Sequence, residues 1–266
     1  MVNIMDKISD IKTKYKEIIN RDLMSYASIK EDLYCFIEDY SSDERSGVKA
    51  QVETAKKKIE AIDAEILRVR GMMSFEEKYG NEYQYICGVD EVGRGPLAGP
   101  IVTAAVILPK GLIIPYVNDS KQLSEKKREE LYEIIKKEAV SYSIGIRTEK
   151  DIDTIGIAPA DSEAMRDSVL GLSPAADMIL VDAFAIPGLD IKQVPIIKGD
   201  TKSISIAAAS IIAKVTRDRM MNEYAEKYPE YGFESNKGYG SAVHIEAIKK
   251  YGPCEIHRRS FIKNFV

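Results

Sequence analysis

The first 79 residues carry apolar side chains at helical spacing on a background rich in Lys, Glu and Asp. The apolar positions that set this period are Ile8, Ile11, Tyr15, Ile18 and Ile19, then Leu33, Phe36 and Ile37, then Ile59, Ile62 and Ile66. Such spacing predicts two or three amphipathic helices. The polar stretch 40–47 predicts the turn of a helical hairpin, and the stretch 71–81 predicts a linker.

From Tyr85 the period changes from that of a helix to that of a strand. Residues 85–92 and 100–108 are rich in Ile, Val, Thr and Ala, and a glycine-containing loop joins them. Two such runs with a short glycine connection predict an antiparallel hairpin.

The rest of the chain alternates helical and strand patterns. Ser124 is a candidate N-cap for a helix that ends near Ala139. In the later helical region 149–170, Pro159 fits best at a break or in a first turn. The predicted strands are 140–146, 178–182 and 194–198, and the predicted helices are 124–139, 149–170, 203–227 and 242–251, with a loop at 229–240. We therefore predict an α/β fold, a mixed β-sheet with helices on both faces. It comprises a helical extension at 1–80, a main domain at 84–266 and a small helical part at the C-terminal end.

Composition limits the kind of protein and the kind of metal site. The chain has 266 residues, and no apolar run approaches the roughly 20 residues that cross a bilayer. Its first 20 residues are charged and lack a signal-peptide core, so we expect a cytoplasmic protein. Its three cysteines match no zinc or redox spacing, and it has only two histidines. Any bound metal must therefore be held by oxygen ligands, which favours Mg²⁺ or Mn²⁺.

Four acids lie at or just after the ends of apolar runs. They are Asp90, Glu91, Asp182 and Asp200. Neighbouring strands can bring these carboxylates to one point, where like charges raise one another's pKa unless a cation is bound. Divalent ions held there can activate water against a phosphodiester. Surface acids that merely cap strands or turns are the alternative.

Charge is unevenly distributed along the chain. The net charge is −4, but residues 191–266 hold 13 Lys and Arg against 8 Asp and Glu. The basic last third therefore favours a nucleic-acid partner, although the net charge alone does not.

Several ordered motifs together resemble ribonuclease HII, the type 2 ribonuclease H family, over roughly residues 84–260. The motifs are CGVDEVGRGPLAGP, DSKQLS, ILVDA, KGD followed by SIAAASIIAKVTRDR, and KGYGSAVHIEAI. The resemblance implies a ribonuclease H-like fold and cleavage of RNA in RNA/DNA hybrids. It also implies nicking on the 5′ side of a lone ribonucleotide in duplex DNA, which leaves 3′-hydroxyl and 5′-phosphate ends and serves ribonucleotide removal.

The same resemblance assigns roles to residues. The family's four catalytic, metal-binding carboxylates correspond to Asp90, Glu91, Asp182 and Asp200, with Mn²⁺ or Mg²⁺ as cofactor. Gly93, Arg94 and Gly95 match the loop whose backbone reads the ribose 2′-hydroxyl, the group that separates RNA from DNA. Tyr239 matches the tyrosine that packs on the sugar at the RNA-to-DNA junction. Further phosphate or site-organising contacts correspond to Lys121, Lys202, Lys214 and Arg217.

Three positions fall outside this pattern. Asp218 is a tempting further acid, but we interpret it as structural, paired with Lys214 one helical turn back. Ala183 stands where the family commonly has glycine, and we expect a slight change in the backbone beside Asp182 that leaves this ligand in place. The helical extension occurs only in some members, and a solvated appendage, a partner surface and a nucleic-acid contact are all open for it.

Two other functions compete with this interpretation. One keeps the fold but cuts DNA as a resolvase does, or acts as a type 3 ribonuclease H; the glycine-arginine-glycine loop and Tyr239 favour type 2. The other is a non-catalytic binding protein, which leaves Asp182 and Asp200 unexplained. We expect a monomer that acts on RNA/DNA hybrids and on DNA with embedded ribonucleotides, away from membranes.

Overall fold

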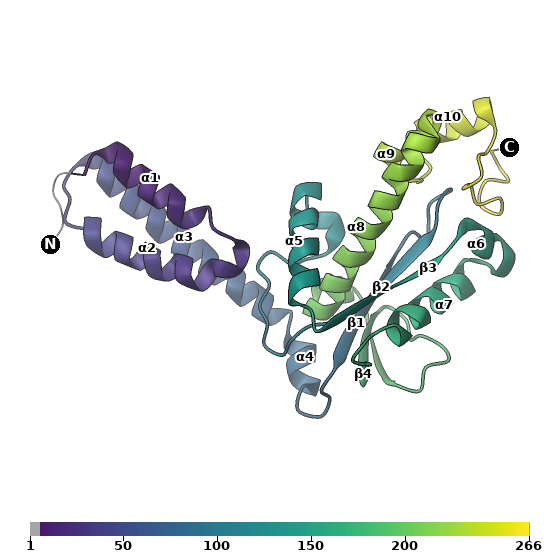
Figure 1. Ribbon diagram of the computed structural model, residues 1–266, viewed down its shortest axis with the longest axis horizontal. Coiled ribbons are helices and arrows are strands. Elements are labelled where there is room, and N and C mark those ends of the chain that lie inside the picture. The colour runs from purple at the N-terminus through teal and green to yellow at the C-terminus, as the bar shows by residue number, and fades with distance from the viewer. Residues whose placement is uncertain (1–5, 266) are drawn as a thin grey trace. The chain divides into compact units, whose positions relative to one another are not determined.

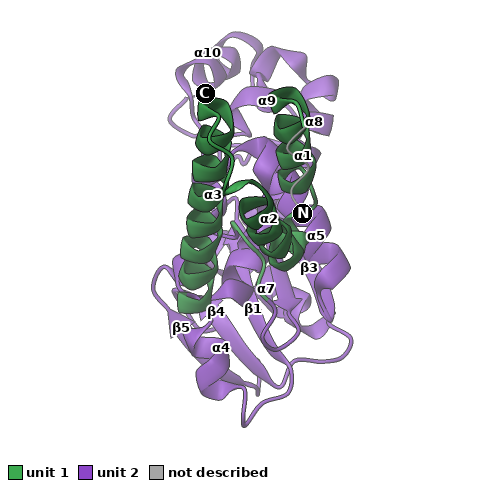
Figure 2. Ribbon diagram, turned by 90° about the vertical axis from the view of Figure 1, so that its left-hand side faces the viewer, with its two compact units in different colours: residues 1–71, 113–116 green, residues 72–112, 117–266 purple. Residues whose placement is uncertain are grey.

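The computed structural model describes residues 6–265, which divide into two compact units (Figure 2). Unit 1 comprises the chain up to Gly71 together with the segment 113–116, and unit 2 comprises the remainder. Within residues 6–265, no helix combines the length and apolar character that crossing a membrane requires.

Unit 1 is helical, as its sequence period predicts. Helices α1 (Ile8–Ile19), α2 (Tyr26–Tyr40) and α3 (Ser46–Gly71) follow in order, with a short 3₁₀ turn at Leu23–Ser25 before α2. Their buried faces form one core that includes Ile11, Leu33 and Ile59. The predicted hairpin turn at 40–47 is confirmed between α2 and α3. Three amphipathic helices bury their apolar faces against one another.

Unit 2 is built on a five-stranded sheet (Figure 1). Its strands are β1 (Ile86–Val92), β2 (Ile101–Ile107), β3 (Ser141–Arg147), β4 (Met178–Asp182) and β5 (Lys192–Ile196). They lie in the order β3-β2-β1-β4-β5. β1 pairs antiparallel with β2, and β2 with β3, whereas β4 runs parallel to both β1 and β5. The mixed sheet and its initial hairpin are therefore confirmed.

Helices cover both faces of this sheet. On one face α7 (Ile157–Leu170) contributes Met165 and Val169 to a core shared with Val89 of β1. On the other face lies the long helix α8 (Ile204–Lys227), which approaches β1 so closely that a Cβ on Gly88 would lie 2.0 Å from the Ser205 carbonyl carbon. Glycine is required there because no side chain fits. α5 (Glu125–Glu138) packs against α8, and α6 (Glu149–Ile155) precedes α7.

The C-terminal part is a small helical cluster. A 3₁₀ turn at Pro229–Tyr231 leads to α9 (Phe233–Asn236) and α10 (Ala242–Tyr251). Phe233, Ile248 and Ile262 are buried in one apolar cluster with the C-terminal end of α8. The predicted bounds of α10 are confirmed, as is the cap of α5, where Ser124 Oγ accepts from the Lys127 N–H at 3.3 Å.

Four element predictions need correction. The predicted linker 71–81 contains α4 (Ser74–Tyr79), which is anchored because Glu76 accepts hydrogen bonds from Ser203 and from the backbone of Ser205 at the start of α8. The helical region 149–170 is two helices divided at Gly156, while the predicted placement of Pro159 in a first turn is confirmed at the start of α7. β5 begins two residues before the predicted strand 194–198, and the predicted loop 229–240 contains α9.

Candidate active site

Three of the four predicted acids meet at one edge of the sheet. Val89 of β1 pairs with Val181 of β4, so Asp90 and Asp182 are the next residues on two parallel neighbours. Glu91 follows Asp90 on β1. One carboxylate oxygen from each of Asp90, Glu91 and Asp182 lies within 4.8 Å of the other two. Parallel strands end at the same sheet edge, which is how residues 92 positions apart come together.

Burial and mutual repulsion make two of these carboxyl groups, those of Asp90 and Glu91, hard to ionise. Asp90 is only 6% exposed, and burial, followed by the charges of Glu91 and Asp182, raises its pKa well above the usual range. Burial also raises the pKa of Glu91 to about 7, with the charge of Asp161 as the next cause. A cation at this point would stabilise the ionised forms.

Asp200 lies beside this cluster but is not one of the three acids whose oxygens meet. It follows β5 in a 3₁₀ turn, Gly199–Thr201, and the N–H of Gly199 donates to Asp182 Oδ1 at 2.7 Å. Burial raises the pKa of Asp200, and the charges of Asp119 and Asp182 act in the same direction. The predicted fourth acid is thus electrostatically coupled to the cluster through Asp182.

Lys121 is one of the basic residues coupled to these acids. Burial alone would lower its pKa, but the charges of neighbouring carboxylates outweigh burial and raise it. Those carboxylates belong to Asp119, Asp90, Asp200 and Glu91. Its ammonium group is therefore positive at neutral pH and placed to attract an anion to the cluster.

Two buried arginines hold the glycine loop that follows β1. Gly93 has φ = +100°, a conformation that favours glycine, and its carbonyl accepts from Arg258 Nη2 at 2.6 Å. Arg258 also donates to the carbonyls of Arg94 at 3.0 Å and Gly99 at 2.9 Å. Arg217 donates to the carbonyls at positions 98, 100 and 237. The buried guanidinium groups thus hold the loop by charged hydrogen bonds, which are stronger than neutral ones.

This arrangement places one predicted basic residue inside the protein. Arg217 is fully buried, and its three hydrogen bonds to main-chain carbonyls fit the site-organising contact, one of the two roles expected for it. Arg258 is also fully buried, although sequence reasoning placed it only in a basic tail. Part of the positive charge of the last third is therefore internal.

Tyr239 stands beside the glycine loop with its side chain accessible. It is 43% exposed, and the Arg217 guanidinium carbon lies 5.9 Å from its ring centre. A Cβ on Gly95 would lie 3.9 Å from Tyr239 Cε1, which places the ring next to the loop. The backbone joins them too, because Leu97 N–H donates to the Gly238 carbonyl at 2.8 Å. The loop and the aromatic ring thus form one surface.

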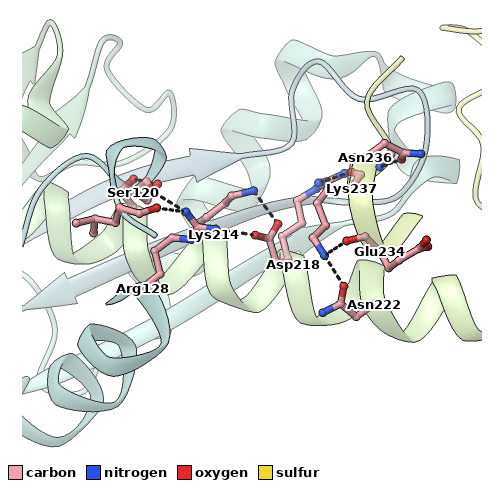
Figure 3. Close-up of polar contacts among 12 residues, drawn as sticks. Ser120, Arg128, Lys214, Asp218, Asn222, Glu234, Asn236 and Lys237 are labelled. Carbon is pink, nitrogen blue, oxygen red and sulfur yellow. Dashed lines mark hydrogen bonds and ion pairs between the residues drawn. The ribbon is translucent and has the colours of Figure 1, made fainter. Parts of the chain in front are cut away.

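The remaining predicted basic residues are engaged with the protein. Lys214 Nζ donates to Asp218 at 2.7 Å, and Arg128 Nη2 lies 3.9 Å from the other oxygen of Asp218 (Figure 3). The predicted Lys214–Asp218 pair is therefore confirmed. Lys202 Nζ donates to the Ile197 carbonyl at 2.9 Å and is exposed.

Asp161 is a candidate site residue that the sequence did not reveal. It lies on α7, is 5% exposed, and faces Arg94 Nε at 3.4 Å, while Arg94 Nη1 lies 4.0 Å from Glu91. It lines a cleft of about 190 Å³ together with Glu91 and Asp182. Burial raises its pKa to about 6. Nothing in the local pattern separates this acid from the solvated acids of an amphipathic helix.

The residue after Asp182 has an unusual backbone. Ala183 has φ = +59°, in the left-handed region that costs a residue with a Cβ about 1 kcal/mol or more. This is the position where glycine was expected. The altered side chain therefore leaves the glycine-type backbone in place.

Known proteins resemble this chain along most of its sequence. A family model described as Ribonuclease HII matches residues 87–264. The chain belongs to the ribonuclease HII family. A second model, the ribonuclease HII N-terminal domain, matches residues 7–80. The family makes the chain a type 2 ribonuclease H, a hydrolase that cleaves RNA in RNA/DNA hybrids.

Individual relatives extend the similarity over nearly the whole chain. A ribonuclease HII from Lachnoclostridium phytofermentans is 52% identical over 258 residues, which cover 97% of each protein. One from Ruminiclostridium cellulolyticum is 57% identical over 205 residues, covering 77% of this chain and 80% of that protein. The crystal structure of the ribonuclease H2 from Pyrococcus horikoshii has a TM-score of 0.58 at 29% identity. It covers 68% of this chain and 97% of that one.

Proposed function

We propose that this ribonuclease HII nicks duplex DNA on the 5′ side of a single embedded ribonucleotide, as well as cutting longer RNA/DNA hybrids. The observation that carries the proposal is that two features lie within six residues: the acids Asp90 and Glu91 lie near the end of β1, and the loop from Gly93 to Gly95 follows that strand directly. The atoms that cut and the atoms that recognise a ribose are thereby fixed to one turn.

Asp90, Glu91 and Asp182 suit one or two Mg²⁺ or Mn²⁺ ions. All their donor atoms are carboxylate oxygens, which these hard cations prefer. Burial first, and then neighbouring carboxylate charge, raises the pKa values of Asp90 and Glu91, and a bound cation would favour their ionised forms. A divalent ion bound there supplies an activated water and neutralises charge on the phosphate. Asp200, coupled to Asp182, completes the proposed catalytic set.

The chain's other residues position the substrate. The Gly93–Gly95 backbone approaches the 2′-hydroxyl, and the ring of Tyr239 packs on the sugar beside it. Lys121 and Lys202 attract the phosphates. Because Arg258 and Arg217 already fix the loop carbonyls, little ordering is needed when the ribose binds. We further propose that residues 84–266 carry this chemistry and that residues 1–80 form a separate helical extension.

A substrate comparison with mapped product ends tests the function. The protein is given Mg²⁺ or Mn²⁺ with three labelled substrates: an RNA/DNA hybrid, a duplex with one ribonucleotide, and the matched all-DNA duplex. We expect cleavage of the first two, with the nick 5′ to the ribonucleotide and ends that are 3′-hydroxyl and 5′-phosphate. Cleavage of the all-DNA duplex would indicate a resolvase-type enzyme, and cleavage of the hybrid alone would contradict single-ribonucleotide recognition.

A further inference from the structure

The chain has only two histidines, and they lie in contact in the C-terminal helical part. His244 is in the first turn of α10, and His257 lies beyond the end of that helix. Both are at most 1% exposed, and their Nε2 atoms are 3.0 Å apart. The rings of Tyr231 and Phe233 pack edge-on or tilted against them. No step of the proposed reaction uses these buried imidazoles.

Each end of the pair meets a backbone group whose role is fixed. The backbone N–H of Cys254 lies 2.9 Å from His257 Nδ1, and an N–H can only donate. The carbonyl oxygen of Tyr239 lies 2.8 Å from His244 Nδ1, and a carbonyl can only accept. His257 must therefore carry its proton on Nε2, and His244 must carry its proton on Nδ1.

These two tautomers are fixed independently, and they are compatible at the contact between the two Nε2 atoms. His257 Nε2–H donates to the bare Nε2 of His244, and both rings are neutral. Protonating His244 at Nε2 would leave no acceptor between the two rings. Protonating His257 at Nδ1 would oppose the Cys254 N–H, with only Cys254 Sγ, 3.0 Å away, left as a weak acceptor. Burial lowers the pKa of both imidazoles, which keeps them neutral at physiological pH. The hydrogen bonds thus run in one direction, from Cys254 through His257 and His244 to Tyr239.

The segment that carries His257 is attached to the glycine loop. His257 forms an antiparallel bridge with Ala98. On either side of the bridge, the Gly99 N–H donates to the Ile256 carbonyl at 2.8 Å, and the Arg258 N–H donates to the Leu97 carbonyl at 2.9 Å. One histidine is therefore fixed to the loop proposed to read the 2′-hydroxyl, and the other holds the backbone of Tyr239.

We propose that His244 and His257 are positioning residues, which set Tyr239 at a fixed distance from the Gly93–Gly95 loop. The inference rests on the proposed function, in which the tyrosine ring and the loop grip one ribose. Tyr239 sits between Gly238 and Gly240, two residues with wide backbone freedom. The bond from His244 Nδ1 to the Tyr239 carbonyl adds to the other bonds of this segment: the Ser241 N–H donates to the same carbonyl at 2.8 Å, and the Tyr239 N–H donates to the Asn236 carbonyl at 2.9 Å.

The tautomers give a direct test that needs no substrate. Protein without a histidine tag, labelled with ¹⁵N at histidine, contains four imidazole nitrogens. Long-range ¹H–¹⁵N spectra at pH 7 should show two neutral rings of opposite tautomer, one protonated at Nδ1 and one at Nε2. Substituting His257→Gln should remove the Nε2–H ring and so assign the signals. Two rings of the same tautomer, or a ring that titrates near pH 6.5, would contradict the one-directional chain of hydrogen bonds from Cys254 to Tyr239.

A matched pair of variants tests the positioning role. His244→Asn places an amide N–H near the position of Nδ1 and keeps the donor to Tyr239. His244→Gln places its amide near Nε2, which keeps the contact to His257 and loses the one to Tyr239. We expect kcat/KM on the single-ribonucleotide duplex to fall about tenfold for the Gln variant and at most about threefold for the Asn variant, in line with loss of one buried hydrogen bond.

Two controls separate positioning from general loss of structure. The unfolding temperature should fall by a similar amount in both variants, because each loses one hydrogen bond: the Asn variant the bond to His257, and the Gln variant the bond to Tyr239. In a Tyr239→Ala background, His244→Gln should have no further effect on kcat/KM. Equal activity losses in the Asn and Gln variants, or an undiminished loss in the Tyr239→Ala background, would refute the proposal. Wild-type protein that fails to nick the duplex would instead refute the proposed function, and the tautomers would still decide whether the one-directional chain of hydrogen bonds exists.

Discussion

The acid cluster and the arginine-held loop adjoin one another and are built on opposite principles. In the cluster, Asp90, Glu91 and Asp182 bring like charges within 4.8 Å, and burial raises the pKa of the first two. In the loop, Arg258 and Arg217 are fully buried, yet each donates three hydrogen bonds to main-chain carbonyls. The cluster concentrates like charge that Lys121 and Arg94 offset only in part, whereas the polar groups of the loop are satisfied by the protein itself.

This difference separates the acids that would bind a metal ion from the loop that would distinguish ribose from deoxyribose. A cluster of like charges lowers stability but creates affinity for a cation, a common exchange at functional sites. A recognition loop needs the reverse, because a mobile backbone would accept deoxyribose and ribose alike. Substitutions in the two regions should therefore have opposite effects on stability.

The largest effect is expected for Asp90→Asn. Losing a buried metal ligand should reduce the nicking rate by more than roughly a thousandfold, about 4 kcal/mol of transition-state stabilisation. The same change should raise the unfolding temperature of the metal-free protein, since it removes a buried carboxyl group that resists ionisation. Rate assays and thermal unfolding in EDTA check both signs. Asp167→Asn, an exposed acid paired with Arg147, should change neither, and an active Asp90→Asn protein would remove Asp90 from the catalytic set.

Arg258→Met, which affects the loop, should lower stability, whereas Asp90→Asn should raise it. It leaves three carbonyl groups without their donor, and we expect the free energy of unfolding to fall by about 3–4 kcal/mol. Arg259→Met is the matched control, because that neighbouring residue is exposed and should cost no more than about 0.5 kcal/mol. Urea denaturation measures both. Equal losses at the two positions would mean that the buried guanidinium does not support the loop.

The pH dependence of the metal-free protein should reveal the cluster. The pKa of Glu91 rises from 4.5 to about 7 on folding, so the folded state binds this proton more tightly than the unfolded state does. Its stabilising contribution is present below pH 4.5 and is lost as the pH rises through 7, by roughly 2–3 kcal/mol. Urea denaturation in EDTA at pH 5 and pH 8 measures the loss, and Glu91→Gln should flatten it. An unchanged slope in that variant would assign the dependence to other groups.

The sequence predicted the acid cluster because its geometry follows from strand periodicity. Asp90 and Asp182 each end an apolar run, and parallel neighbours end at the same sheet edge. Strand patterns of this kind are local, so the β1–β2 hairpin and the 178–182 strand could be placed without knowledge of the rest of the chain. The resemblance to ribonuclease HII then supplied the roles of Gly93 and Tyr239, which periodicity alone does not reveal.

The supporting residues could not be predicted because their partners are distant in sequence. Arg258 bonds carbonyls more than 150 positions earlier, and arginines near a chain end are ordinarily exposed. Asp161 looks like any other polar residue of an amphipathic helix until the fold brings α7 to Arg94. The anchoring of α4 by Glu76 is also a long-range contact, which is why residues 71–81 suggested a linker. Long-range polar contacts leave no period in a sequence.

The smallest expected effect lies in the backbone of the acid cluster. Ala183 follows Asp182 with φ = +59°, where a Cβ is strained, so Ala183→Gly should relieve about 1–2 kcal/mol in the folded state. The added freedom of glycine in the unfolded chain offsets about 0.4–1 kcal/mol of this gain. We therefore expect a net stabilisation of about 0.5–1 kcal/mol by urea denaturation, with activity retained because Asp182 keeps its bond to Gly199. Ala185→Gly, two residues later at an exposed position without a positive φ, should destabilise by a similar amount. If both substitutions destabilise, the backbone beside Asp182 is not strained. The contrast between the acid cluster, which concentrates like charge, and the loop, whose carbonyls are hydrogen-bonded by arginine, would then rest on charge alone.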